Sequence, residues 1–282
     1  MNNDSPILND YVFKQVFGQK DNDPLLIAFL NAMLDGELVV KSVKILNSEL
    51  PRTSETSRNI LLDVQAQVDD GTYVDIEVQQ GYSKDLLYRM SVYGTRMVSK
   101  YSQKGTDFDS TRCIAIWLLN CNMPEFNMFG NDRIQGEVHF KSLERKELSL
   151  PVELLKIYPI ELKKGSNVEH FSEIKKTWIE FLATSASSGV KKTNNVEELE
   201  IAYDKMQRIT GSEKYRNYME AIEKAEELER HKLFSAKAIG LAQGEHKKAI
   251  ETAKKMLSKG FSLEDVSECT GLSIDDIKKL IK

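Results

Sequence analysis

Acidic and amide side chains occupy alternate positions in the segment 59–80, which reads NILLDVQAQVDDGTYVDIEVQQ. Apolar side chains fill most of the positions between them, so both arms of the segment alternate with a period of two. This alternation is typical of β-strands with one buried face. Carboxylate oxygens brought together on one face of such strands suit a hard divalent cation such as Mg²⁺.

The turn between the two arms decides which side chains face each other. A two-residue Asp70-Gly71 turn would place Asp63 opposite Val78 and set a polar face beside an apolar one. A three-residue loop with Gly71 in the left-handed conformation is also common in hairpins, and it places Asp63 opposite Glu77. Because this register keeps both faces consistent, we predict the three-residue loop.

Opposed carboxylates on neighbouring strands have Cβ atoms roughly 5 Å apart, where like charges destabilise the pair. Asp75, which this register places opposite Gln65 on the same face, adds a third negative charge. Mg²⁺ binds one or two carboxylates together with water and substrate phosphate, so it would relieve this repulsion. The alternative is a solvent-facing polar side of an antiparallel sheet, which needs no metal.

Length and composition are those of a globular protein with room for about two domains. The 282 residues are 41% hydrophobic and 29% charged, and the formal net charge is −4. The acidic excess lies in residues 1–189, which does not favour nonspecific binding of nucleic acid, but the charge neither supports nor excludes a DNA substrate. The three cysteines lack a CxxC pair, and we find no signal peptide or membrane-spanning stretch, so we expect a cytoplasmic protein.

The periodicity of apolar residues predicts an α/β architecture before residue 185. The segment Arg112–Asn120 is almost entirely apolar, as a strand covered on both faces should be, and two covered faces require helices on both sides of the sheet. The other expected elements are helices over Asp10–Phe17, Asp23–Leu34, Lys84–Tyr101 and His170–Leu182, strands over Val39–Leu46 and Leu155–Leu162, a hairpin within Glu137–Leu150 and a loop over Pro51–Arg58.

The expected helix after the hairpin carries a basic ridge beside its apolar stripe. Arg89, Arg96 and Lys100 recur at intervals of seven and four residues, and Tyr93 borders them. One interpretation is a solvated face whose long side chains cover apolar surface. The other is a phosphate-binding ridge, because this helix directly follows the strand that carries Glu77.

Residues 183–189, ATSASSG, are small and polar, and we expect a linker there. Beyond it the composition turns helical. The predicted helical segments are Val196–Ile209, Tyr215–Glu229 and a further stretch through Lys259. We expect a domain over residues 1–185, a helical region over 190–245 and a small helical hairpin over 246–282.

The segment 246–282 has the outline of a helix-turn-helix. Ser262 and Ser273 each precede a short helix, and a Gly-containing turn separates the two helices. The last helix opens with Asp275 and Asp276, where a recognition helix would approach bases and phosphates. We therefore favour a protein-binding or self-associating hairpin here, and a homo-oligomer formed through it.

Several of these segments resemble, in the same order along the chain, the Rpn family of recombination-promoting nucleases and transposases in the PD-(D/E)XK nuclease superfamily. NDYVFKQVFG resembles the opening signature of the family, and LLDVQAQVDDGTYVDIEVQ resembles its active-site hairpin. YRMSVYGTRMVSKY is similar to the helix that follows, and IYPIELKK and KTWIEFL are similar to a later strand and helix. AKKMLSKGFSLEDVSECTGLSIDDIKKL resembles the C-terminal hairpin of the family.

The resemblance implies an α/β, restriction-endonuclease-like core with a mixed sheet flanked by helices, followed by an all-helical C-terminal region. It also implies metal-dependent cleavage of DNA. Asp63 and Glu77 fall on the two acidic positions of the family, and Val78 would offer its backbone carbonyl to the metal. Gln79 stands where the wider superfamily usually has Lys, and Leu62 stands where Pro often precedes the Asp.

The implied reaction is hydrolysis of a phosphodiester by Mg²⁺ or another divalent cation held by Asp63 and Glu77. Gln79, on the same face, is a candidate for orienting the attacking water, although an amide cannot act as a base. The side chains expected at DNA phosphates are Lys14, Arg89, Tyr93 and Arg96.

Two other functions remain open. One is a DNA-binding or assembly protein whose nuclease core has decayed. The other is a different phosphoryl-transfer enzyme, which has less support because the sequence contains no Gly-rich phosphate loop and no HExxH motif.

Overall fold

The computed structural model describes residues 5–19, 21, 23–46, 49–50, 60–61, 63–102, 111–124, 155–162, 171–184 and 196–280. The loop expected over Pro51–Arg58 and the hairpin expected within Glu137–Leu150 lie outside these residues. The chain divides into two compact units, residues 1–212 and residues 213–282.

The first unit contains a short 3₁₀ helix, η1 (Pro6–Leu8), five α-helices and seven strands among its described residues. The helices are α1 (Asp10–Phe17), α2 (Asp23–Leu34), α3 (Leu86–Tyr101), α4 (Glu173–Thr184) and α5 (Glu197–Thr210). The strands are β1 (Val43–Ile45), β2 (Glu49–Leu50), β3 (Ile60–Leu61), β4 (Val64–Val68), β5 (Tyr73–Gln79), β6 (Cys113–Leu119) and β7 (Leu155–Glu161). The second unit contains α6 (Glu213–Ser258), α7 (Leu263–Thr270) and α8 (Ile274–Lys279).

Five strands form one mixed sheet in the order β1-β4-β5-β6-β7, and β2 and β3 pair separately. Strands β1, β4 and β5 are antiparallel neighbours, whereas β5, β6 and β7 are parallel. All seven residues of β6 are buried, as the sequence predicts for a strand covered on both faces. Pro159 lies in β7 at the edge of the sheet, where a residue without a backbone N–H is tolerated. The predicted α/β architecture is therefore confirmed.

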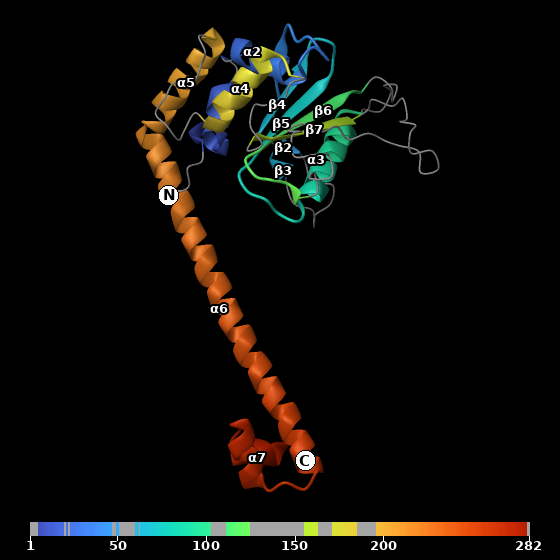
Figure 1. Cartoon of the computed structure of the whole chain (residues 1–282), viewed down its shortest axis with the longest axis vertical. Coiled ribbons are helices and arrows are strands. Elements are labelled where there is room, and N and C mark those ends of the chain that lie inside the picture. The colour runs from blue at the N-terminus through green and yellow to red at the C-terminus, as the bar shows by residue number, and fades with distance from the viewer. Residues whose placement is uncertain are drawn as a thin grey trace, which may run out of the picture. The chain divides into compact units, whose positions relative to one another are not determined.

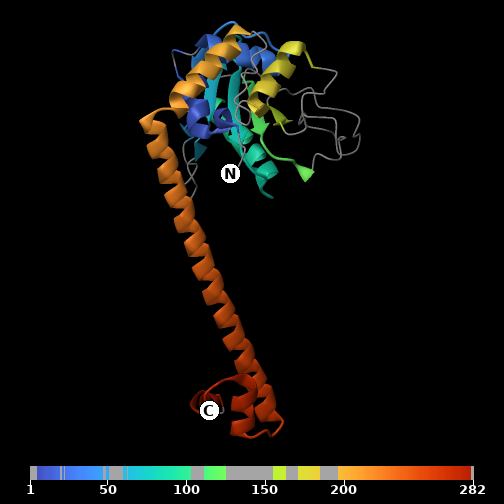
Figure 2. The ribbon, with the colours of Figure 1, turned by 60° about the vertical axis from the view of Figure 1, so that its left-hand side comes forward.

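Helices cover both faces of the sheet, with α3 on one face and α2 and α4 on the other (Figure 1 and Figure 2). On the face of α2 and α4, the rings of Phe17 and Trp178 lie within 6.1 Å of each other, and the ring of Phe29 lies 5.2 and 5.5 Å from them. These aromatic contacts join α1, α2 and α4 into one layer, which brings α1 close to the sheet.

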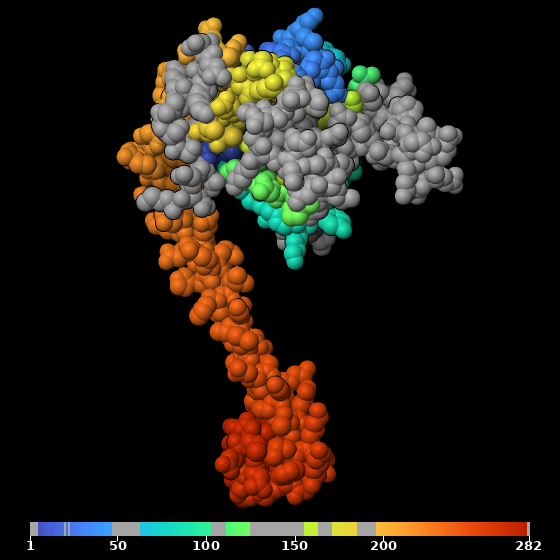
Figure 3. Space-filling view, in the orientation of Figure 1, coloured from blue at the N-terminus to red at the C-terminus, as the bar shows by residue number. Residues whose placement is uncertain are grey.

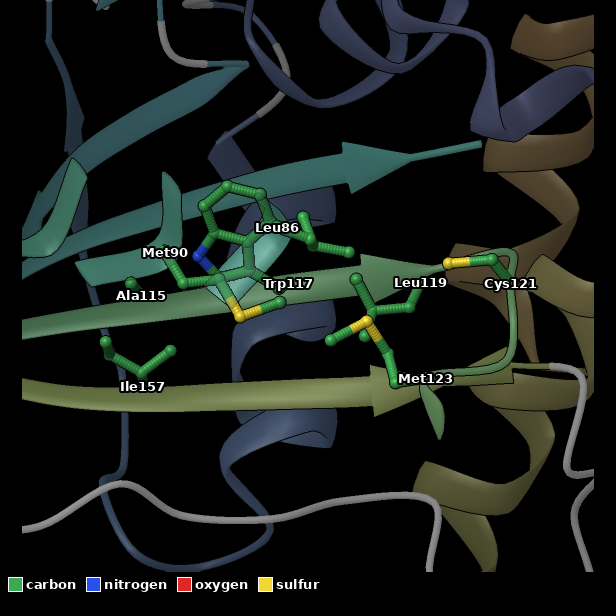
Figure 4. Close-up of a cluster of buried hydrophobic side chains, with 8 residues drawn as sticks. All are labelled: Leu86, Met90, Ala115, Trp117, Leu119, Cys121, Met123 and Ile157. Atoms are coloured by element: carbon green, nitrogen blue, oxygen red, sulfur yellow. The ribbon is translucent and has the colours of Figure 1, made fainter. Parts of the chain in front are cut away.

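Helix α3 buries the apolar stripe that its sequence predicts. Leu86, Met90 and Met97 are buried, and Tyr93 packs partly buried beside them. Leu86 and Met90 join side chains of β6 and β7, Trp117 among them, in the cluster drawn in Figure 4. The helix is thereby fixed on the same face of the sheet as the polar side of the hairpin.

Strand β1 is shorter than the strand expected over Val39–Leu46. The backbone N–H and C=O of Val40 are both bonded to the side-chain amide of Asn31, each at 2.8 Å. The next two backbone N–H groups donate to Asp69 Oδ1 at 2.8 and 3.2 Å. Because side chains satisfy these backbone groups, pairing with β4 begins only at Val43.

The division between the two units falls later in the chain than the expected linker at residues 183–189. Helix α4 continues to Thr184, and residues 185–195 lie outside the described part of the chain. Helix α5 packs against α1 and α2, so it belongs to the first unit. The expected domain boundaries at 185, 190 and 245 stay a prediction about which segments fold by themselves.

Helix α6 is a single helix of 46 residues, which runs without interruption across the expected boundary at residue 245. It contains Gly240 and Gly244, each of which costs a helix about 1 kcal/mol relative to Ala. Large apolar side chains are exposed along its middle: Leu228, Leu233, Phe234, Ile239 and Leu241. Figure 3 draws the surface of this helix in orange. Among the described residues, no helix has the length and apolar character needed to cross a membrane.

The end of α6 packs with α7 and α8 around a small core of its own. The hydroxyls of Ser262 and Ser273 each accept a backbone N–H three residues on, at 3.1 Å, as the sequence predicts for helix caps. Gly271 ends α7 in the left-handed conformation, with φ +70°. The buried side chains of this core are Ala253, Val266, Leu272 and Ile277.

Candidate active site

The β4–β5 hairpin has the register predicted from its loop. Gly71 has φ +88°, and the N–H of Val68 donates to the carbonyl of Thr72 at 2.9 Å, so three residues form the loop. Gln65 lies opposite Asp75, as expected. This register brings the polar side chains of both strands to one face of the sheet.

Asp63 and Glu77 meet at the far end of this hairpin, and backbone amides hold them together. The N–H of Asp63 donates to Glu77 Oε1 at 3.1 Å, and the N–H of Val78 donates to Asp63 Oδ2 at 2.8 Å. Both side chains are buried, with 8% of Asp63 and 4% of Glu77 exposed. The two predicted acidic residues and Val78 are therefore in direct contact.

Burial and mutual repulsion disfavour the ionised forms of these carboxylates. Burial raises the pKa of Glu77 well above its usual range, and the negative charges of Asp75 and Asp63 raise it further. Burial also raises the pKa of Asp63, although the hydrogen bond from Val78 and the charge of Lys14 act against it. The nearby positive charge does not offset burial and repulsion, and a bound cation would add to it.

Helix α1 contributes Lys14 and an acidic residue that the sequence analysis missed. Lys14 Nζ lies 3.2 Å from Asp63 Oδ1, which makes it the cation nearest to the pair among the described residues. Burial and the charge of Asp63 raise the pKa of Asp10 to about 6. In the sequence Asp10 marks only the start of a helix. Its spacing of one turn from Lys14 was the available signal, because residues i and i+4 share a helix face.

Asp75 and Gln65 form a buried polar layer next to the acidic pair. Gln65 Oε1 accepts hydrogen bonds from Lys100 Nζ at 3.1 Å and from the Tyr101 hydroxyl at 2.7 Å. The ring of Tyr101 stacks on that of Tyr73, with centroids 3.6 Å apart. Asp75 Oδ1 and Gln65 Nε2 are buried and have no hydrogen-bond partner among the described residues. Asp75 thus keeps one buried acceptor atom to which no described residue donates a hydrogen bond.

Gln79 and Arg89 lie at the end of β5 beside the pair. Arg89 Nη1 donates to Gln79 Oε1 at 3.0 Å, and its guanidinium carbon lies 5.6 Å from the ring centroid of Tyr93 and 5.9 Å from that of Trp117. Arg96, seven residues farther along α3, is half-buried. Of the predicted basic ridge, Arg89 bonds to Gln79 and Lys100 bonds to Gln65.

The residues at this site fit a hard divalent cation. Within the described ranges, no three His, Cys, Asp or Glu side chains converge as a ready set of ligands. Mg²⁺ needs no such set, since one or two carboxylates, water and phosphate complete its coordination. Asp63 and Glu77 would supply the carboxylates, and Asp75 Oδ1, which has no partner among the described residues, is a buried acceptor that a hydrated cation would satisfy.

A pocket of about 180 Å³ lies at the opposite ends of β5 and β6. Its lining includes Thr72, Cys113, Glu37 and Lys156, and it includes none of the predicted site residues. Glu37 accepts hydrogen bonds from Lys156 and from the Tyr158 hydroxyl, so its carboxylate is already paired. The candidate site is thus the carboxylate cluster and not this pocket.

Comparison with protein families gives two matches along the chain. Residues 7–236 match the model of the PD-(D/E)XK nuclease family transposase, and residues 246–282 match the Rpn/YhgA-like nuclease family, C-terminal HTH domain. No curated protein and no solved structure was found to match. The second match confirms the helix-turn-helix outline of residues 246–282. The sequence alone favours a protein-binding or self-associating hairpin there, and this match reverses that preference.

Proposed function

The chain belongs to the PD-(D/E)XK nuclease family of transposases, and we propose that it is a metal-dependent endonuclease that hydrolyses phosphodiester bonds in DNA. The contact between Asp63 and Glu77 carries this proposal, since both are buried and joined by backbone amides. Burying two like charges together costs free energy, and Lys14 is close to only one of the two carboxylates, so a bound cation is the best explanation of the pair.

Asp63, Glu77 and the backbone carbonyl of Val78 would hold the divalent cation, which we take to be Mg²⁺. The chemistry that such a cation supplies is a lower pKa for a bound water and neutralisation of charge on the phosphate. Lys14, 3.2 Å from Asp63, is able to move from that carboxylate to a phosphate oxygen when the cation replaces its charge. Burial of the cluster strengthens each of these electrostatic interactions.

We further propose that DNA is bound by the helix-turn-helix domain at residues 246–282 as well as by the nuclease unit. Self-association is a separate proposal, and the exposed apolar side chains of α6, such as Leu233 and Phe234, support it. The two proposals are compatible, because helix-turn-helix proteins commonly bind DNA as dimers.

The test of the endonuclease proposal is incubation of purified protein with plasmid DNA in Mg²⁺ and in chelator. Asp63→Asn and Glu77→Gln should each lower cleavage at least about 100-fold, and the double variant should be no worse than either, because the ligands act as a unit. The matched control is Asp70→Asn, which removes an exposed charge from the loop of the same hairpin and keeps the acceptor for the Thr72 N–H. This variant should cleave like the wild type.

The melting temperature gives a second readout that does not depend on cleavage. Mg²⁺ should stabilise the wild type by about 2.7 kcal/mol when its concentration is roughly 100 times its Kd, and it should not stabilise Asp63→Asn. If Mg²⁺ leaves the melting temperature unchanged while DNA still binds, the alternative of a decayed nuclease core is correct. If both acidic variants still cut, the active site lies elsewhere.

A further inference from the structure

Both polar atoms of the Gln79 side chain are engaged by the protein. Gln79 Oε1 accepts from Arg89 Nη1 at 3.0 Å, and Gln79 Nε2 donates to the carbonyl of Gly81 at 2.5 Å. These partners fix the orientation of the amide, because the reverse orientation would set its NH₂ group against the Arg89 donor. The two hydrogen bonds leave one lone pair of Oε1 and one N–H of Nε2, but they tie the amide to Arg89 on one side and to the backbone on the other.

The partner of Gln79 is held on its other side by aromatic rings. The guanidinium of Arg89 lies within 6 Å of the ring centroids of Tyr93 and Trp117, a distance typical of cation–π contact. Its positive charge lowers the pKa of both Asp63 and Asp10, although burial outweighs it in each case. Arg89 is thus a cation near the acidic pair that is restrained from two sides.

We propose that Gln79 is a positioning residue for Arg89, and that Arg89 is the group that binds the scissile phosphate. This inference rests on the proposed endonuclease function and names a substrate contact within it. A guanidinium has five N–H donors, so the hydrogen bond to Gln79 leaves others for two phosphate oxygens in the bidentate geometry that Arg favours. Gln79 holds the side chain of Arg89 in place and leaves its positive charge intact. A carboxylate at this position would neutralise that charge.

The same geometry explains why an amide suits position 79. A lysine there would have no acceptor for Arg89, and it would bring a second cation next to the guanidinium. The resemblance to nucleases with Lys at this position led to the hypothesis that Gln79 orients water, in which case Gln79→Lys should keep or raise activity. If Gln79 acts through Arg89, Gln79→Lys should instead lower activity, as Gln79→Leu should.

The decisive experiment is a double-mutant cycle with Gln79→Leu, Arg89→Gln and the double variant, measured as kcat/KM for Mg²⁺-dependent cleavage of a short duplex DNA. Each single change should lower kcat/KM roughly tenfold or more, the effect expected for losing a hydrogen bond to a charged group. The double variant should be no worse than Arg89→Gln alone, because Gln79 then has nothing left to position. If the two losses multiply, Gln79 acts independently of Arg89, and the proposal is wrong.

The control background is Lys84→Gln, which removes an exposed charge just before α3 and touches neither residue. In that background Gln79→Leu should keep its full effect. The same cycle is measured as the Kd for the duplex in chelator, where no cleavage is needed. If the wild type binds DNA without cutting it, the proposed endonuclease function is wrong, and the Kd values of the cycle still test whether Gln79 acts through Arg89. If the wild type neither binds nor cuts DNA, both the function and this inference are wrong.

Trp117 provides a spectroscopic readout of where Arg89 lies. The other tryptophan, Trp178, packs against phenylalanines on the opposite face of the sheet, so a change near Arg89 should alter only Trp117 emission. Gln79→Leu should shift the emission of the metal-free protein in the direction that Arg89→Gln shifts it, and Trp117→Phe should abolish the difference. Unchanged emission in Gln79→Leu would mean that Gln79 does not hold Arg89, and it would overturn the proposal.

Discussion

Glu37 and Glu77 are two carboxylates of the first unit whose surroundings move their pKa values in opposite directions. Burial acts to raise the pKa of Glu37, but hydrogen bonds from Lys156 and Tyr158 outweigh it, so the pKa is lowered. At Glu77 burial and the charges of two aspartates act together, so the pKa is raised. Ionised Glu37 therefore stabilises the fold at neutral pH, whereas ionised Glu77 destabilises it in the absence of a cation.

The contribution of Glu37 gives a pH-dependent prediction. Its folded-state pKa lies below the ordinary value of 4.5, so its stabilisation is present above that pH and is lost as the pH falls through the folded-state pKa. Glu37→Gln should lower the free energy of unfolding at pH 7 by less than about 1 kcal/mol, because the pair is partly exposed to solvent. Urea unfolding of both proteins between pH 3 and 7 measures this difference, which should narrow toward the acidic end.

The control for Glu37 is a background that lacks its cationic partner. In Lys156→Met, the substitution Glu37→Gln should cost less at pH 7 than it does in the wild type. A difference that stays constant across the pH range would show that the ion pair is not its cause.

At the scale of elements, the site depends on how closely α1 approaches β4. Gly18 ends α1, and a Cβ there would lie 2.9 Å from the backbone oxygen of Lys14 and 3.3 Å from Val64 Cγ2. An added methyl group would have to displace the backbone of α1 or the side chain of Val64. The absence of a side chain at Gly18 therefore sets the position from which Lys14 reaches Asp63.

Gly18→Ala should consequently impair both stability and cleavage. We expect a loss of about 1–3 kcal/mol in the free energy of unfolding, which is typical of overpacking, and a lower kcat/KM because Lys14 moves. Gly81→Ala is the control, since nothing lies within 4 Å of the Cβ it would add. Thermal unfolding and plasmid cleavage of both variants measure the effect. A Gly18→Ala protein as stable as Gly81→Ala would contradict the close approach.

The hairpin could be predicted from sequence because its information is local. Loop length and alternation fix the register, so the contact of Asp63 with Glu77 follows from the order of the residues alone. The hydrogen bond between Arg89 and Gln79 could not be predicted, because it depends on where α3 packs against the sheet, and the only signal for Asp10 was its position one helical turn before Lys14. The helical character of residues 215–259 could be predicted from composition, and the structure joins these segments in one helix, α6.

At the scale of the whole molecule, the two units should divide chemistry from DNA affinity. The residues proposed for catalysis lie in residues 1–212, and the helix-turn-helix match lies in residues 213–282. A chain ending at Ser212 keeps the sheet, the described helices that pack on it, and α5, which packs on α1 and α2. This truncated protein should retain Mg²⁺-dependent cleavage and bind duplex DNA more weakly than the full chain.

The salt dependence of DNA binding measures what the second unit contributes. Loss of phosphate contacts on truncation should flatten the slope of log Kd against log salt concentration. If DNA affinity and slope are unchanged while the truncated protein forms a smaller oligomer than the full chain, the second unit serves self-association instead. A truncated protein that folds but does not cleave would show that residues 213–282 are needed for the chemistry.

The hairpin also has a consequence for the order in which the chain folds. The hydrogen bond from Asp63 to Glu77 spans only 14 residues, whereas β7 joins the sheet from Leu155 onward. Short loops close fastest, and hairpins form in about 1–10 μs. The acidic pair should thus meet in the folding nucleus, where its repulsion raises the barrier. Mg²⁺ should then speed refolding in stopped-flow experiments. If Mg²⁺ changes only the unfolding rate, the hairpin forms after the folding transition state. An ion selected for catalysis would in that case also act as a folding accelerator for the chain that binds it.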